Sequence, residues 1–92
     1  MKVKNNIQEV ENLLKAEKSE QAKQLFAALE EQPTVAYFLL KGKIEQKYQN
    51  WGDAINAFNR VLEIDPQNIE AQNNLHLINN ILSFWNPDLL NP

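Results

Sequence analysis

Apolar residues recur along the chain at spacings of three and four, which is the period of a helix with one buried face. Two such sets occupy the first third of the sequence, and the polar stretch AEKSEQ separates them. The first set is Ile7, Val10, Leu13 and Leu14, and the second is Ala22, Leu25, Phe26 and Leu29. Two amphipathic helices with a short link are expected to pack as antiparallel neighbours. Ser19, in the link, is the expected N-cap of the second helix.

Three further helices are expected in the rest of the chain. Pro33 ends the second helix, because proline disfavours a helical conformation of the residue before it, and Thr34 caps the third. The third helix carries VAYFLLKGKIEQKY, and the segment QNWGD breaks it. The fourth ends at Asp65 and Pro66, and the fifth starts near Ile69. No alternating apolar and polar segment of useful length appears, so the chain is predicted to be all-α with about five helices.

Residues 35–68 contain an ordered set of aromatic, small and proline residues. Phe38 stands early in the third helix, and Gly42 follows it. In the fourth helix Ala54 comes first, Phe58 follows it, and Pro66 marks the end. This order resembles the tetratricopeptide repeat (TPR), a helix pair with a period of roughly 34 residues. The resemblance implies a short right-handed α-solenoid of antiparallel helix pairs.

The resemblance also divides the chain, taken as one TPR-like domain over 1–92, into parts. In the earlier helix pair, Ala22 and Phe26 echo Ala54 and Phe58. The expected parts are a degenerate repeat at 5–33, a well-matched repeat at 35–68, a capping helix at 69–85 and an apolar C-terminal tail at 86–92.

Small residues in the well-matched repeat predict where its two helices approach most closely. Gly42 and Ala54 are the small residues at the predicted facing positions, and bulky side chains there would hold the helices apart. Phe38 and Phe58 are expected to fill the space around this contact. Gly42 and Ala54 are therefore expected to face each other.

No catalytic or metal chemistry is visible in the sequence. His76 is the only histidine, and it has no cysteine, aspartate or glutamate at ligand spacing. The two glycines are too far apart for a phosphate-binding loop, and no nucleophile and base are paired. We therefore expect neither an enzyme nor a bound cofactor or metal.

Composition and charge narrow the classes of partner. The chain has a net charge of -3 and 43% hydrophobic residues, which is typical of a soluble domain. Basic residues are scattered among acidic ones, so the sequence lacks the basic face on which nucleic acids bind. Neither a signal peptide nor a run of roughly 18 apolar residues that could span a membrane is present. Neither nucleic acid nor membrane is expected as a partner, and a cytoplasmic location is expected.

In the TPR family the first helices of successive repeats line a concave groove, and the resemblance assigns this role to one face of three helices here. Lys43 and Lys47 would give this groove a local positive charge, suited to an acidic or C-terminal carboxylate group of a partner. The alternative is that Lys43 and Lys47, four residues apart, form only a solvated helix face with no role in binding. Leu39 and Leu40 stand where chaperone-binding members have polar residues, so chaperone C-termini are not expected to bind. The expected groove residues are Ile7, Glu11, Leu14, Leu39, Lys43, Gln46, Lys47, Asn73, Leu77, Asn80 and Ile81.

Two functions from different classes follow. The first is a non-catalytic protein–protein interaction module, or adaptor, that binds a peptide or protein segment in the groove. The alternative is a structural protein that self-associates through the ends of the helix array or through its C-terminal tail. A monomer or a weak homodimer is expected.

The tail leaves three possibilities open. Phe84, Trp85, Leu89 and Leu90 all fall within the final ten residues, SFWNPDLLNP. This apolar segment could seal the open end of the array, fold back into the groove, or exchange between two subunits. In each case Trp85 is expected to be mostly buried.

Overall fold

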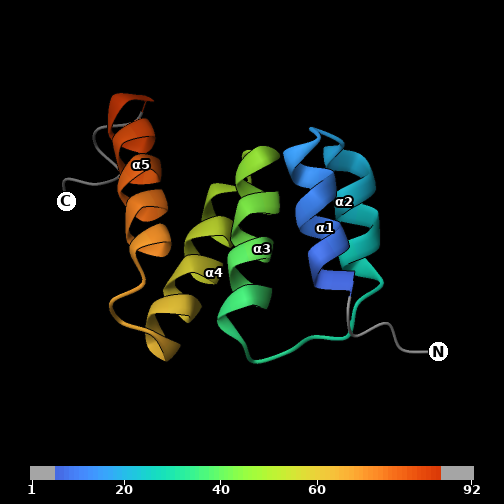
Figure 1. Ribbon diagram of the computed structural model, residues 1–92. Helices are drawn as coiled ribbons and strands as arrows, with labels where there is room; N and C mark the ends of the chain where they lie inside the picture. Colours follow the sequence, from blue (N-terminus) through green and yellow to red (C-terminus); the bar gives the residue numbers. More distant parts are fainter. Residues whose placement is uncertain (1–5, 86–92) are drawn as a thin grey trace.

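The computed structural model describes residues 6–85 and contains five α-helices and no strand in that range (Figure 1). The all-α prediction is therefore confirmed for the described residues. The apolar tail at 86–92 and the side chain of Trp85 lie outside them, so the expectations about both stay predictions. The helices are α1 (Asn6–Lys15), α2 (Ser19–Ala27), α3 (Val35–Lys47), α4 (Trp51–Ile64) and α5 (Ile69–Trp85).

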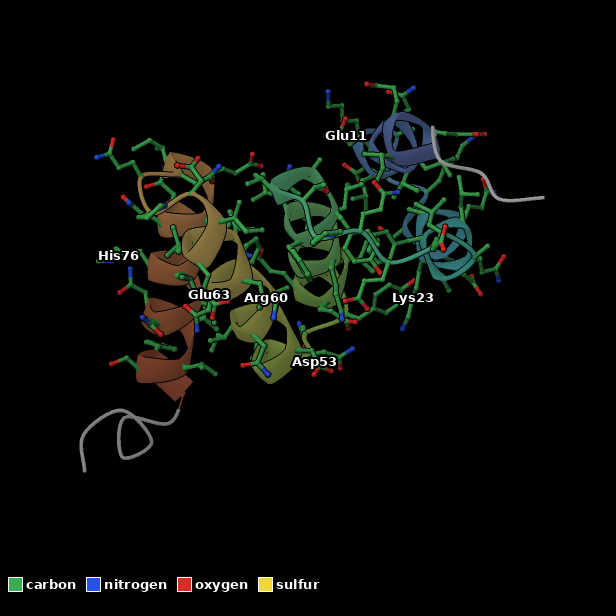
Figure 2. The ribbon with its side chains drawn as sticks, turned by 90° about the horizontal axis from the view of Figure 1, so that it is seen from below. Glu11, Lys23, Asp53, Arg60, Glu63 and His76 are labelled. Carbon is green, nitrogen blue, oxygen red and sulfur yellow. The ribbon has the colours of Figure 1, made fainter. Side chains whose placement is uncertain are left out.

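The helices form a row in which α3 takes the central place (Figure 1). Helix α1 packs on α2, α3 packs on α4, and α5 packs on α4. Helix α3 also contacts both α1 and α2, so it joins the first helix pair to the second. Helix α5 stands at one end of the row and α1 and α2 at the other, over a length of 47 Å (Figures 1 and 2).

Side chains fix the start of α3 but not the start of α2. The hydroxyl of Thr34 accepts a hydrogen bond from the backbone N–H of Tyr37 at 3.2 Å, which confirms the predicted N-cap. The expected cap at Ser19 is wrong. Ser19 is the first residue of α2, and Lys18 holds the N-cap position without a side-chain hydrogen bond. A tight turn after α1 places the helix start one residue earlier than the serine pattern suggests.

The turns inside the two helix pairs have the same backbone geometry. Glu17 after α1 and Gln49 after α3 both adopt a φ of 61°, a left-handed conformation that ends a helix. The amides that follow point back into the helix in the same pattern. These bonds run from Glu17 N to Leu14 O, Lys18 N to Leu13 O, Gln49 N to Gln46 O, and Asn50 N to Glu45 O. The two helix pairs thus share one turn conformation.

Apolar side chains from every helix form one continuous core. Its most enclosed large side chains include Phe58 and Leu40, and no polar side chain is buried within residues 7–84. Most of the buried positions recur at spacings of three and four along the helices. They are Val10, Ala22, Phe26, Leu29, Tyr37, Phe38, Leu40, Ile44, Ala54, Ala57, Phe58, Val61, Ala71 and Ile78.

Gly42 marks the closest approach of α3 to α4. A Cβ atom at Gly42 would lie 2.6 Å from Cε1 and 2.7 Å from Cζ of Phe58, which is too close for any side chain. Phe58 is fully buried, so its ring has no free space into which to move. The residue facing Gly42 is therefore Phe58. The expected pairing of Gly42 with Ala54 stays a prediction, and Ala54 is itself fully buried.

Cation–π contacts add to the packing of α3 against its neighbours. The ammonium nitrogen of Lys23, on α2, lies 4.2 Å from the ring centroid of Tyr48, the residue that ends α3. The guanidinium carbon of Arg60, on α4, lies 4.9 Å from the ring centroid of Phe38. Exposed contacts of this kind contribute about 0.5–1 kcal/mol each. They supplement the apolar core at both sides of α3.

An aromatic cluster joins α2 to α3. The ring centroids of Phe26 and Tyr37 are 4.7 Å apart, and Phe38 meets Tyr37 edge-on at 5.3 Å. Burial raises the pKa of the Tyr37 hydroxyl above its ordinary value of 10.0, and the negative charge of Glu31 adds to the increase. The neutral form of Tyr37 is therefore the form that fits this cluster.

The two glycines provide a matched pair of substitutions. Gly42→Ala is expected to lower the free energy of unfolding by about 1 kcal/mol, because overpacking outweighs the helix propensity gained by removing a glycine. Gly52→Ala, in the first turn of α4, meets no heavy atom within 4 Å and is expected to raise stability by about 0.5–1 kcal/mol. Urea unfolding measures both values. Equal effects of the two variants would contradict the Gly42–Phe58 contact.

Tyr37 is expected to make stability depend on alkaline pH. The unfolded chain releases the Tyr37 proton at a lower pH than the folded protein, so stability is retained below the ordinary pKa of 10.0 and falls as the pH rises through it. Tyr37→Phe should reduce this fall, whereas Tyr48→Phe, at an exposed tyrosine, should retain it. Urea unfolding at a series of alkaline pH values compares the two. If the stability of both variants fell equally with pH, the alkaline loss of stability would not come from Tyr37.

Candidate functional site

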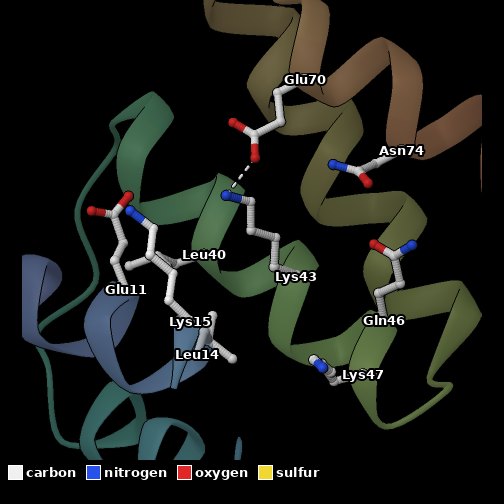
Figure 3. A pocket seen from close by; sticks show the side chains of 9 residues that line it. All are labelled: Glu11, Leu14, Lys15, Leu40, Lys43, Gln46, Lys47, Glu70 and Asn74. Atoms are coloured by element: carbon white, nitrogen blue, oxygen red, sulfur yellow. Dashed lines mark ion pairs between the residues drawn. The ribbon is translucent and has the colours of Figure 1, made fainter. Parts of the chain in front are cut away.

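An open groove of about 430 Å³ lies between α1, α3 and α5 (Figure 3). Leu14 and Leu40 supply apolar surface, and charged and amide side chains surround them. Leu40 also belongs to the core, with 1% of its surface exposed, so this part of the groove is fixed by the packing beneath it. The lining residues, called here the α1–α3–α5 groove, are Glu11, Leu14, Lys15, Leu40, Lys43, Gln46, Lys47, Glu70 and Asn74.

Helices α1 and α3 contribute corresponding positions to the groove. Relative to the shared turn geometry, Glu11, Leu14 and Lys15 on α1 stand where Lys43, Gln46 and Lys47 stand on α3. Two helices that repeat the same conformation thus turn the same face toward one hollow.

The structure brings together five of the residues expected in the groove. These are Glu11, Leu14, Lys43, Gln46 and Lys47. Ile7 and Leu39 do not line it, and both pack partly buried against the apolar core, as Leu14 does.

Helix α5 turns the expected face to the groove, but it meets the groove only in its first two turns. Glu70 and Asn74 line it, whereas Asn73, Leu77, Asn80 and Ile81 do not. Ala71 and Ile78 are fully buried, and this buried stripe fixes the rotation of α5 about its own axis. The sequence carries a usable signal for this face: Glu70 and Asn74 are polar residues beside the apolar positions Ala71 and Leu75.

An ion pair closes the groove on the side of α5. The ammonium group of Lys43 contacts a carboxylate oxygen of Glu70 (Figure 3). Both side chains keep contact with solvent, with exposed fractions of 34% and 47%. Lys15 and Lys47 form no ion pair within residues 6–85. The positive charge expected from Lys43 is therefore balanced, and Lys15 and Lys47 outnumber the other acidic residue of the groove, Glu11.

Hydrogen bonds before α5 determine where Glu70 is placed. The side-chain oxygen of Asn68 accepts from the backbone N–H of Ala71 at 2.9 Å, and its amide nitrogen donates to Asp65 at 3.4 Å. The side chain of Gln72 donates to the carbonyl of Pro66 at 3.0 Å. The first turn of α5 is therefore anchored to the preceding loop, and Glu70 lies within that turn.

Histidine, metal-ligand and membrane-spanning features within residues 6–85 also bear on function. His76 is exposed on α5, at the end of the molecule far from α1 (Figure 2). Within the described residues no group of three or more His, Cys, Asp or Glu side chains could hold a metal ion. No helix in the same range is long and apolar enough to cross a membrane.

Apolar side chains also reach solvent on α5. Leu77 is 49% exposed, Ile69 is 64% exposed and Phe84 is 79% exposed. Leu77 and Ile81 belong to the second apolar stripe of this helix, about 100 degrees from the buried one. Helix α5 thus carries an apolar surface at the end of the row.

Comparison with known proteins gives no assignment: no family model, curated protein or solved structure matches the chain. The functional argument therefore depends on the geometry of the groove.

Loss of the Asn68 cap is expected to weaken the start of α5. Asn68→Ala should lower the free energy of unfolding by about 1 kcal/mol, because the N–H of Ala71 loses its partner. Asn68→Asp should retain most of the stability, and Asn73→Ala, exposed in the middle of α5, should leave it unchanged or slightly higher. Urea unfolding tests the series, and amide hydrogen exchange locates the effect. Equal stability of Asn68→Ala and the natural protein would contradict the capping role.

Proposed function

We propose that this protein is a non-catalytic interaction module that binds a peptide segment of a partner protein in the α1–α3–α5 groove. The observation that carries the proposal is that α1 and α3 line one hollow with corresponding positions. Glu11, Leu14 and Lys15 on α1 correspond to Lys43, Gln46 and Lys47 on α3. A hollow lined by corresponding positions of the first helices of successive pairs suits an extended ligand, which can contact both helices.

The chain architecture supports the same proposal. Helix α3 contacts both helices of the preceding pair, and the two pairs share one turn conformation. Both features fit a short right-handed α-solenoid of the TPR type, which remains part of the proposal. In such an array each pair buries its apolar face on its neighbour, and the first helices line the binding surface.

The chemistry of the groove favours a ligand that combines an apolar side chain with a carboxylate. Leu14 offers apolar contact, and the amides of Gln46 and Asn74 offer hydrogen bonds. Three lysines and two glutamates line the groove, so the local charge is positive in a protein whose net charge is -3. Lysine ammonium groups form charge-assisted hydrogen bonds with carboxylates. An acidic side chain or a C-terminal carboxylate of the partner fits this charge.

A second candidate function is assembly of the protein with itself. The exposed apolar surface of α5, with Leu77 and Ile69, favours it. Sedimentation at several concentrations distinguishes the two functions: a monomer throughout supports the interaction module, and a tight dimer supports assembly.

Peptide titration followed by NMR tests the groove directly. The probe is a short, end-blocked glycine–serine peptide that carries adjacent leucine and glutamate residues. Its amide shift changes should cluster at residues 11–15, 40–47 and 70–74. Lys47→Gln should weaken binding by about two- to fivefold, because an exposed charge pair contributes less than about 1 kcal/mol.

The matched control is Lys18→Gln, which removes the same charge at an exposed position outside the groove. It should bind the probe nearly as well as the natural protein. Shift changes scattered over the surface, or none at millimolar peptide, would contradict the proposed function.

A further inference from the structure

We infer that Glu70 is a built-in competitor for the groove: its carboxylate occupies Lys43 in the free protein and is displaced by a carboxylate of the partner. The inference rests on the proposed function and specifies how that site is regulated. The Glu70 carboxylate stands in the groove as an internal substitute for the acidic group of the ligand.

The position of the ion pair makes this competition direct. Lys43 lies on α3, in the central helix of the groove, and its side chain extends toward Glu70 on α5 (Figure 3). Of the ion pairs within residues 6–85, this one joins two helices, whereas Arg60 and Glu63 pair within α4. A ligand lying across α3 therefore meets a Lys43 ammonium group that is already paired with the carboxylate of Glu70.

The pair is weak enough to be exchanged. Lys43 and Glu70 are 34% and 47% exposed, so water screens their attraction and solvates Glu70 once it is released. A partner carboxylate at Lys43 replaces one charge pair by another of similar strength. The internal carboxylate therefore lowers the affinity of the groove without blocking it.

Helix α5 does not depend on this ion pair for its position. Ala71 and Ile78 are fully buried, and Asn68 caps the first turn. These contacts hold the backbone of α5 in place while the side chain of Glu70 rotates away. They also keep Glu70 close to Lys43, at a high effective concentration, when no partner is bound.

The competition gives the groove chemical selectivity. A neutral segment cannot replace the charge interaction that Lys43 makes with Glu70, so it leaves the pair intact. An acidic segment can replace that interaction and gains the freed ammonium group. Removal of the Glu70 charge should therefore strengthen binding of acidic ligands alone.

Glu70→Gln tests the competition against Glu63→Gln, which makes the same change of charge on α4, a helix that contributes nothing to the groove (Figure 2). The probes are the leucine–glutamate peptide and its leucine–glutamine counterpart, titrated by NMR. Glu70→Gln should bind the acidic peptide about two- to fivefold more tightly and the neutral peptide unchanged. Glu63→Gln should match the natural protein with both peptides.

A second measurement needs no peptide. The rate at which an acylating reagent modifies the Lys43 amine, mapped by mass spectrometry, should rise in Glu70→Gln and not in Glu63→Gln. Unchanged affinity for the acidic peptide, or unchanged Lys43 reactivity, would overturn the competitor role while leaving the binding function intact. Absence of groove shifts with every protein and both peptides would overturn the proposed function and, with it, this inference.

Discussion

The contact between Gly42 and the ring of Phe58 is the constraint on which the rest of the molecule depends. A Cβ atom at Gly42 would lie 2.6 Å from the ring, so α3 and α4 can adopt their observed distance only because residue 42 has no side chain. Phe58 fills the space that results and is fully buried. Helix α3 is also the element that joins the two helix pairs. A displacement of α3 from α4 would therefore move the central part of the whole row.

The same contact orients the groove. Gly42 and Lys43 are neighbours in the chain, so the rotation that presses Gly42 against Phe58 turns Lys43 out of the core and toward α5. Leu40, Gln46 and Lys47 follow on the same helix, and α1 supplies the corresponding face from the other side. One face of α3 thus packs in the core of the second helix pair, and another face of the same helix lines the groove. This coupling explains how a small helical protein can hold lysines at fixed positions without burying their charges.

Helical periodicity and cap chemistry predicted most of the fold, because each depends on residues close together in the chain. The apolar stripes predicted all five helices, and Thr34 predicted the start of α3. Contacts between helices were harder to predict. The small residues Gly42 and Ala54 were expected to meet, but a glycine can also accommodate a large ring, and periodicity does not reveal which partner faces it. On α5 the repeat pattern indicated Leu77 and Ile81, whereas Glu70 and Asn74, on the same face but nearer the start of the helix, line the groove. Periodicity identifies the face of a helix, but how far along that face a groove extends depends on where the neighbouring helices lie.

Nuclear Overhauser effects between Gly42 and the aromatic rings test the central claim most directly. In the folded protein the Hα protons of Gly42 should show strong effects to the ring protons of Phe58, and ring currents should shift their resonances. These signals depend on the distance between α3 and α4 at one point and need neither a ligand nor a substitution. Strong effects to the methyl group of Ala54, with none to Phe58, would show a different register of α4 on α3 and would contradict the geometry from which the groove is derived.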